Sequence, residues 1–294
     1  MATWLCIGGT RLATPHGAVA VEDLVPGTKL AMRDGPPQPV GGIGRIRLSV
    51  IELLTRAELW PVRIAAGALA DGIPAADAVV MAEQPLAAPG FAPVAAKWLV
   101  DGIGLRRPMP GAALDVYSLS LPGAPAGDAC LGDGAAAARP ADAVLHDVRR
   151  HLADRAGIAA GTLAGSVDTV TGRRIGGWAA DASAHPVAVE LEVDGGIAPP
   201  CVADLPRADL AAAGVGDGRR GFQLTFDPPP DPRRSHLLRL RRALDGADLP
   251  GSPVLLDSAA GIAALLAALA PGPELDESIA AACRAVAGRL AARQ

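Results

Sequence analysis

The chain contains no asparagine, and aromatic residues make up only 3% of its 294 residues. Without asparagine it has no acceptor for N-linked glycosylation and no asparagine side chain that could take part in catalysis. Basic residues are almost all arginine, because Lys29 and Lys97 are the only lysines. The net charge of −4 and a pI near 5.7 leave no overall basic surface for phosphates, so we expect no nucleic-acid partner.

Long hydrophobic runs are also missing, although half of the residues are hydrophobic. The longest uncharged apolar run covers residues 259–270 and is far shorter than the ~20 residues that a membrane-spanning helix needs. The N-terminus lacks the basic and apolar segments of a signal peptide. We therefore expect no membrane span and, by default, a cytoplasmic location; export by a route without such a signal stays open.

Neither the cysteines nor any short motif indicates a metal or a cofactor. The chain has no Walker A, G-x-S-x-G, H-E-x-x-H or dinucleotide-binding pattern. Its cysteines are widely spaced and never form a C-x-x-C pair, which argues against both a disulfide framework and a zinc site. These cysteines are Cys6, Cys130, Cys201 and Cys283. We expect no metal and no cofactor.

The first half of the chain consists of short apolar runs separated by glycine and proline, which is typical of an all-β domain. Residues 10–14 and 18–21 flank a Pro-His-Gly turn and predict a hairpin. Residues 29–33 lead into a turn at Asp34-Gly35, after which residues 40–48 are expected to pair back. Further strands are expected at 62–65, 78–81, 94–100 and 115–121, and a short helix at about 50–58.

A change of period separates this first domain, residues 1–139, from the rest of the chain. Residues 140–160 predict a linker helix, and residues 161–256 return to strand alternation and predict a β-sandwich-like domain. Residues 257–294 carry two apolar stripes and predict C-terminal amphipathic helices, which would dock on this chain or mediate self-association. The apolar face of the linker helix comprises Val144, Leu145, Val148 and Leu152. The predicted fold class is mainly β.

Alternation in the second domain predicts which strand residues face the core. Val187, Val189, Leu191 and Val193 share one face, with Glu190 and Glu192 on the other. Phe222, Leu224 and Phe226 likewise alternate with polar residues. Leu238 and Leu240 are expected to point inward, which leaves the arginines of 233–242 on a solvated face. An anion site on those arginines is the alternative.

A group of motifs near the N-terminus resembles the opening of bacterial Hedgehog/intein (Hint) domains. They are Cys6-Ile-Gly-Gly-Thr10, Val21-Glu-Asp-Leu24, Pro26-Gly-Thr28 and Arg33-Asp-Gly35. Residues 61–69, 72–77, 94–102 and 116–117 also fit, in order and at family-like spacing, so the resemblance covers roughly residues 4–139. It implies a Hint-like all-β domain followed by an appended accessory domain.

The resemblance implies self-processing chemistry at the Leu5–Cys6 bond. The Cys6 thiol would attack the preceding carbonyl and convert the peptide into a thioester, which needs a thiolate and a donor for the departing nitrogen. Cys6 is therefore the candidate nucleophile, and Thr10 the second candidate site residue. The alternative is that Cys6 is a small buried hydrophobic residue at the start of a strand.

This chain departs from the family pattern at the residues that would supply protons. Where the family carries a histidine in an "S-P-Q-H" strand, Gln84 is kept but Pro85 follows it. A second family histidine, after the tyrosine of "V-Y-H", is replaced by Ser118. His16 is the only histidine of the region and lies in a predicted turn. Without a C-terminal asparagine, the chain also cannot splice as inteins do.

Two functions follow as hypotheses. The first is a degenerate Hint-domain protein that serves as a non-catalytic binding or scaffold protein, with an unidentified protein partner or with self-association through the C-terminal helices. The second is an autoprocessing protein that forms a thioester at Leu5–Cys6 and cleaves itself. Only five residues precede Cys6, so cleavage would release a short peptide unless the natural protein is longer.

Polar residues of the second domain suggest two further sites. The first is a Ca²⁺ site, which needs six to eight oxygens; no known Ca²⁺-loop spacing is present, so turn capping is the favoured role. Trp178 could stack on a sugar, but a core position is favoured because few aromatics accompany it. The carboxylates considered for Ca²⁺ are Asp168, Asp181, Asp204, Asp209 and Asp217.

Overall fold

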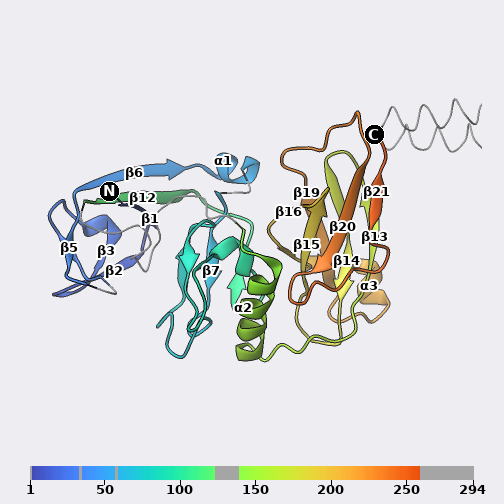
Figure 1. The fold of residues 1–294 in the computed structure, drawn as a ribbon, viewed down its shortest axis with the longest axis horizontal. Coiled ribbons are helices and arrows are strands. Elements are labelled where there is room, and N and C mark those ends of the chain that lie inside the picture. Colours follow the sequence, from blue (N-terminus) through green and yellow to red (C-terminus); the bar gives the residue numbers. More distant parts are fainter. Residues whose placement is uncertain (1, 33–34, 57–58, 123–138, 259–294) are drawn as a thin grey trace, which may run out of the picture. The chain divides into compact units, whose positions relative to one another are not determined.

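The computed structural model describes residues 2–32, 35–56, 59–122 and 139–258 (Figure 1). The chain divides into two compact units: the first is Met1–Ala159 with Ala243–Asp245, and the second is Ala160–Arg242 with the residues from Gly246 onward. Strands predominate in both, so the mainly-β prediction is confirmed. The apolar stripes of the predicted C-terminal helices lie outside the described residues. No helix in the described ranges is long and apolar enough to cross a membrane.

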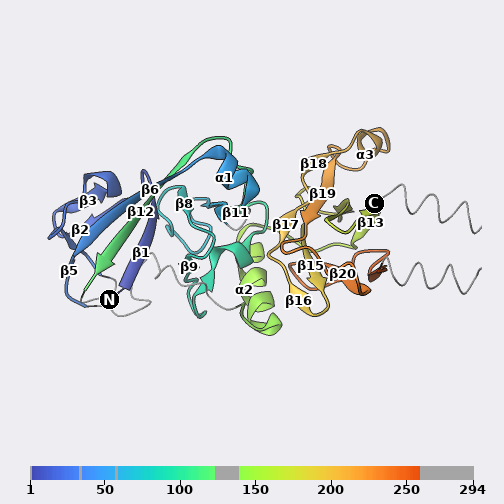
Figure 2. The same ribbon diagram turned by 90° about the horizontal axis from the view of Figure 1, so that it is seen from above.

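The central sheet of the first unit places β12 (Leu114–Leu121) between β1 (Ala2–Ile7) and β6 (Gly42–Leu48), with antiparallel pairing on both sides. Figures 1 and 2 show these three strands side by side. Because side chains alternate along a strand, the sheet has two apolar faces. Ile7, Val116 and Met81 form a small cluster on one face. The larger cluster on the other face comprises Trp4, Cys6, Leu12, Val21, Leu24, Leu30, Val40, Tyr117, Leu119 and Leu121.

The first predicted hairpin is confirmed, and the second is wrong in its pairing. Strands β2 (Arg11–Thr14) and β3 (Gly17–Ala20) pair across the turn that contains His16. However, β4 (Lys29–Leu30) pairs with the two-residue β5 (Gln38–Pro39), while β6 pairs with β12, about 70 residues further on. A local turn signal cannot reveal such a distant partner. The predicted turn residue Asp34 lies outside the described residues.

Among the remaining short elements of the first unit, β7 (Val62–Ile64) and β8 (Ala78–Val80) were predicted, the predicted elements at 94–100 and 50–58 are changed, and η1 (Val21–Asp23), β9 (Pro85–Leu86) and β11 (Leu105–Arg106) were not predicted. The predicted strand 94–100 ends at Ala95, as β10 (Val94–Ala95), and continues as the 3₁₀ helix η3 (Ala96–Leu99). Helix α1 (Val50–Thr55) begins as predicted, with a capping box between Ser49 and Glu52, but it ends at Thr55. Here β11, β7 and β8 form one sheet, and β9 pairs with β10.

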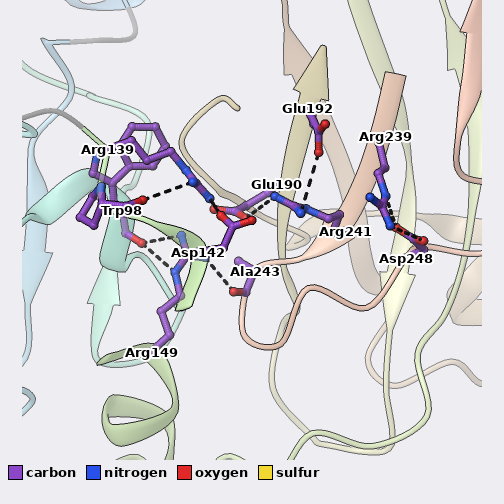
Figure 3. Close-up of polar contacts among 11 residues, drawn as sticks. Trp98, Arg139, Asp142, Arg149, Glu190, Glu192, Arg239, Arg241, Ala243 and Asp248 are labelled. Carbon is purple, nitrogen blue, oxygen red and sulfur yellow. Dashed lines mark hydrogen bonds and ion pairs between the residues drawn. The ribbon is translucent and has the colours of Figure 1, made fainter. Parts of the chain in front are cut away.

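Helix α2 (Asp142–Arg155) belongs to the first unit. The predicted apolar face is confirmed for Leu145, Val148 and Leu152, which are buried, whereas Val144 is exposed. The same helix contributes the buried Arg149, whose guanidinium donates two hydrogen bonds, of 2.9 and 2.7 Å, to the carbonyl of Trp98 in η3 (Figure 3). This polar contact fixes α2 against η3.

The second unit is a sandwich of two antiparallel sheets around one core. One sheet has the order β13 (Ala164–Val170), β14 (Arg174–Ala180), β19 (Arg219–Thr225) and β18 (Leu205–Pro206). The other has the order β16 (Gly196–Ile197), β15 (Ala188–Val193), β20 (His236–Arg242) and β21 (Val254–Leu256), with β17 (Cys201–Val202) also on β15. The short helix α3 (Ala208–Ala212) precedes β19. The core comprises Ile175, Ala179, Val187, Val189, Leu191, Ala203, Phe222, Phe226, Leu238, Leu240 and Leu249.

The inward faces are therefore as predicted, but the outward face of β15 and β20 is only partly solvated: Leu237 and Arg239 are exposed, whereas Glu190 and Arg241 are not. Glu190 and Arg241 are register partners on this face, and their side chains are 0% and 9% exposed. Arg241 pairs with Glu190 and with Glu192, at 3.8 Å each (Figure 3). The prediction of a solvated arginine face holds for Arg239 and is wrong for Arg241, because alternation identifies a face but not the opposite charge that lies across from it.

Trp178 also differs from its expected position. Along β14, the side chains of Ile175 and Ala179 are fully buried in the core. Trp178 lies between them in the alternation, on the outer face of the sheet, and is only partly buried. The prediction of a core tryptophan is wrong.

Candidate active site

Cys6 is the penultimate residue of β1 and lies directly opposite Tyr117 of β12. Its side chain is 2% exposed and packs in the larger apolar cluster of the first unit. Burial raises the pKa of the Cys6 thiol to about 12. Burial thus favours the neutral thiol, whereas the thiolate is the nucleophilic form. The local environment therefore opposes a nucleophilic role.

Ser118, at the position of the second family histidine, does not lie beside the thiol. The register places Ser118 opposite Leu5, so these two side chains share the face that also carries Ile7 and Val116. Cys6 and Tyr117 point to the other face. Ser118 therefore lies beside the Leu5–Cys6 peptide bond, whereas the Cys6 thiol points to the opposite face of the sheet from Ser118.

The segment that contains the first missing histidine packs against the face that Leu5 and Ile7 share. Met81 contacts the cluster formed by Ile7 and Val116. Gln84 is 3% exposed; its backbone N–H donates to the Met81 carbonyl at 3.0 Å, and its backbone carbonyl accepts from the Ala96 amide at 2.8 Å. Pro85 begins β9 and carries no group that could donate or accept a proton. The segment therefore packs against the sheet beside Leu5 and Ile7 and carries no acid–base group at position 85.

Thr10 and His16 serve the backbone around β1 and the first hairpin. The Thr10 amide donates to the Ile7 carbonyl at 3.0 Å, and the Thr10 carbonyl accepts from Val21 at 2.8 Å. Among the described residues, the hydrogen bonds of Thr10 are made by its backbone. His16 is exposed in the β2–β3 turn, where its amide donates to the Thr14 hydroxyl at 3.2 Å. Thus the hydrogen bonds described for Thr10 and His16 hold turns of the backbone.

Glu22 was not assigned a role by the motifs, yet it holds the turn that follows β1. Its carboxylate accepts a hydrogen bond from the amide of Gly9, whose φ of 85° is strained for other residues. The sequence offered one indication of this role: the Glu-Asp pair within Val21–Leu24, since acidic side chains commonly accept hydrogen bonds from the backbone amides of turns. Glu22 connects η1 with the residues just after Cys6.

Other residues of the family-like segments also hold turns. The Asp77 carboxylate accepts from the amide of Ala66 at 2.9 Å. Asp101 accepts from Ile103 at 2.7 Å and from Leu105 at 2.9 Å, and burial raises the pKa of this carboxyl group. The carboxylates of these motifs therefore fix loop conformations of the first unit.

The carboxylates considered for Ca²⁺ in the second unit are mostly paired with arginine. Arg207 binds Asp168 at 2.6 Å and Asp209 at 2.7 Å. Asp181 lies 3.0 Å from Arg242, and Asp217 lies 3.3 Å from Arg220, while Asp204 is exposed. Among the described residues, no three acidic, histidine or cysteine side chains gather as a metal site would require.

The fold and these positions define a mainly-β protein whose first unit carries a cysteine in the first strand of its central sheet. Residues 6–124 match the family model described as the Hint domain. This part of the chain is therefore a Hint domain, as its motifs predicted. No curated protein and no solved structure matches the chain.

Proposed function

We propose that the Hint domain of this protein is a non-catalytic module for binding or scaffolding. The observation that carries this proposal is the state of Cys6, whose thiol is buried among apolar side chains and has a pKa raised to about 12. Thioester formation requires a nucleophilic thiolate and a proton donor for the departing nitrogen. The thiol here is held in its neutral form.

The lack of a proton donor supports the same proposal. Pro85 and Ser118 stand where the family carries histidines, and a serine hydroxyl is a poor general acid at neutral pH. By contrast, Glu22, Asp77 and Asp101 still hold the turns of the domain. The residues that build the fold are thus kept while those that would move protons are replaced.

Autoprocessing is the second candidate, favoured by the family match, which begins at Cys6. In this reaction the Cys6 sulfur attacks the carbonyl carbon of Leu5, and a C–S bond replaces the C–N bond. The thiol proton passes to the Cys6 nitrogen, which becomes a free amine. A nucleophile such as hydroxylamine then cleaves the thioester and releases the residues before Cys6.

Intact-mass spectrometry of the full chain distinguishes the two. We expect no mass change after prolonged incubation with hydroxylamine or dithiothreitol. Release of the segment that ends at Leu5, abolished by Cys6→Ala, would overturn the non-catalytic proposal. A matched measurement is the rate of Cys6 alkylation, followed by peptide mapping. We expect alkylation to be at least about 10³-fold slower in the folded chain than in urea, because a buried neutral thiol is unreactive. Comparable rates would contradict the proposal.

A further inference from the structure

The outer face of one sheet in the second unit carries a hollow. Along β14, Gly176 lies between the inward-facing residues Ile175 and Gly177 and therefore on the outer face. Gly221 of β19 precedes the inward-facing Phe222 and lies on the same outer face. Gly176 and Gly221 form part of the lining of a hollow of about 240 Å³. The lack of a side chain on Gly221 lets Leu205 and the stem of Arg207 approach to 3.0 Å from where a Cβ would stand, so that Arg207 lies over the strands.

One wall of the hollow is a fixed ion-pair cluster. The Arg207 guanidinium donates to Asp209 at 2.9 and 2.7 Å and to Asp168 at 2.6 Å. These bonds use three of its five N–H donors, so two stay available. Asp168 accepts from Arg207 through Oδ2, so that Oδ1 can accept from a ligand. Arg207 and Asp168 are both about one-third exposed, and they present a donor beside an acceptor.

The other wall carries a second cation and an amide. Arg174 lies two residues from Gly176 on the same face of β14, and it is exposed. Its guanidinium makes no ion pair with any residue that the structure describes. Gln223 is the register partner of Gly176 and is also exposed, so its amide offers donors and an acceptor directly above the glycine.

These groups select the chemistry of a ligand. The charges of Arg174 and Arg207 balance those of Asp168 and Asp209, which disfavours a polyanion. Hydroxyl groups both donate and accept, and so they match the Arg207–Asp168 pair and the Gln223 amide. A single carboxylate matches Arg174, because charge-assisted hydrogen bonds are the strong ones. The volume is below the roughly 300 Å³ at which drug-sized pockets begin, so the ligand must be small.

We propose that this hollow binds a sugar acid: a molecule of monosaccharide size that carries several hydroxyl groups and one carboxylate. The carboxylate binds Arg174, and the hydroxyl groups bind Arg207, Asp168 and Gln223. Trp178 lies opposite the lining residue Gly221 on the same face and is partly exposed, so its indole provides a fluorescence probe beside the hollow. The site belongs entirely to the second unit and is independent of the chemistry at Cys6.

Calorimetric titration of the full chain with glucuronate, glucose and acetate tests this proposal, and tryptophan fluorescence provides a second readout. Glucuronate is expected to bind at least about tenfold more tightly than either glucose or acetate, because only glucuronate engages both walls. Equal binding of glucose and glucuronate would overturn the role of Arg174. No binding of glucuronate up to about 100 mM would overturn the site itself.

Two neighbouring arginines provide a matched comparison. Arg174→Ala is expected to weaken glucuronate binding about tenfold or more and to leave glucose binding nearly unchanged. Arg173→Ala removes the same charge one residue away, outside the hollow, and should leave both affinities unchanged. Both side chains are exposed, so both variants should fold, which circular dichroism checks. If both substitutions weaken glucuronate binding equally, the effect comes from the net charge of the surface and not from a contact with Arg174, which would contradict the proposal.

Discussion

Leu5 and Ser118 lie directly opposite each other across β1 and β12, on the face of the sheet from which the Cys6 side chain points away. A group at position 118 can therefore reach the Leu5–Cys6 peptide without reaching the thiol. Formation of a thioester would require Cys6 to leave its apolar cluster and approach the carbonyl of Leu5. Burial of the nucleophile is thus a second barrier, independent of the missing histidines.

This relationship predicts that restored histidines do not restore cleavage. We expect the double variant Pro85→His/Ser118→His to keep its intact mass in hydroxylamine, because Cys6 stays buried and its pKa stays high. Circular dichroism checks that the variant folds. Cleavage at Leu5–Cys6 in the folded double variant, abolished by adding Cys6→Ala, would show that the histidines alone had been lacking.

Stability measurements at Cys6 separate a packing role from a chemical one. Cys6→Ala removes one buried sulfur and is expected to lower the free energy of unfolding by about 1–2 kcal/mol. Cys6→Ser places a hydroxyl among apolar groups and is expected to cost more, roughly 2–3 kcal/mol. Urea unfolding of both variants measures the difference. A serine variant as stable as the wild type would contradict the apolar environment of Cys6.

Glu22 is predicted to stabilise the turn after β1. Glu22→Ala removes the acceptor for the Gly9 amide and should lower the free energy of unfolding by about 1 kcal/mol. Glu22→Gln keeps a carbonyl acceptor and should recover part of this loss. Asp23→Ala is the matched control, since Asp23 is also exposed and lies beside Glu22 in η1. Equal losses for Ala at 22 and 23 would contradict the specific contact.

The first unit shows how far local signals extend. The Pro-His-Gly turn correctly predicted the β2–β3 hairpin, because both strands and their turn lie within residues 10–21. The Asp34-Gly35 turn led to the wrong partner for β6, which pairs with β12 instead. Long-range pairing depends on which apolar faces must be covered in three dimensions, and a local turn motif does not contain that information.

The candidate site shows the same limit. The motifs identified Cys6, Pro85 and Ser118. Alternation along a single strand does not show that Cys6 and Ser118 lie on opposite faces of the sheet; the pairing of β1 with β12 shows it. In the second unit, period-2 patterns correctly placed Val189 and Leu240 in the core. They could not reveal that Glu190 faces Arg241 across two strands and is buried with it.

Arg149 is predicted to be a major stabilising contact of the first unit. Arg149→Met removes two charge-assisted hydrogen bonds to the Trp98 carbonyl and should lower the free energy of unfolding by roughly 2–4 kcal/mol. Arg150→Met is the control on the same helix, since Arg150 is exposed and, among the described residues, forms an ion pair with Asp147 at 3.5 Å. Such a surface pair contributes about 0–1 kcal/mol. Thermal unfolding of both variants should separate them clearly, and equal effects would contradict the role of Arg149.

His236 of β20 is predicted to make stability depend on pH. Its Nδ1 lies 2.7 Å from Asp194 Oδ2, and its Nε2 lies 2.8 Å from the Asp231 carbonyl. Both partners are acceptors, so only the doubly protonated ring donates to both. The Asp231 carbonyl and the Asp194 carboxylate therefore raise the pKa of His236, against the opposing effects of burial and of Arg234. The backbone N–H of Leu237, which donates to Asp194 at 2.9 Å, and the His236 ring lower the pKa of Asp194.

The signs of these two shifts define where stability changes. The contribution of His236 is complete below its ordinary pKa of 6.5 and is lost as the pH rises through its raised value. The contribution of Asp194 is complete above its ordinary 3.8 and is lost as the pH falls through its lowered value. We therefore expect a plateau of stability between these limits and a decline above it, measured by urea unfolding at stepped pH. His236→Gln should abolish the alkaline decline, whereas His16→Gln, in an exposed turn, should keep it. An unchanged decline in His236→Gln would assign it to another group.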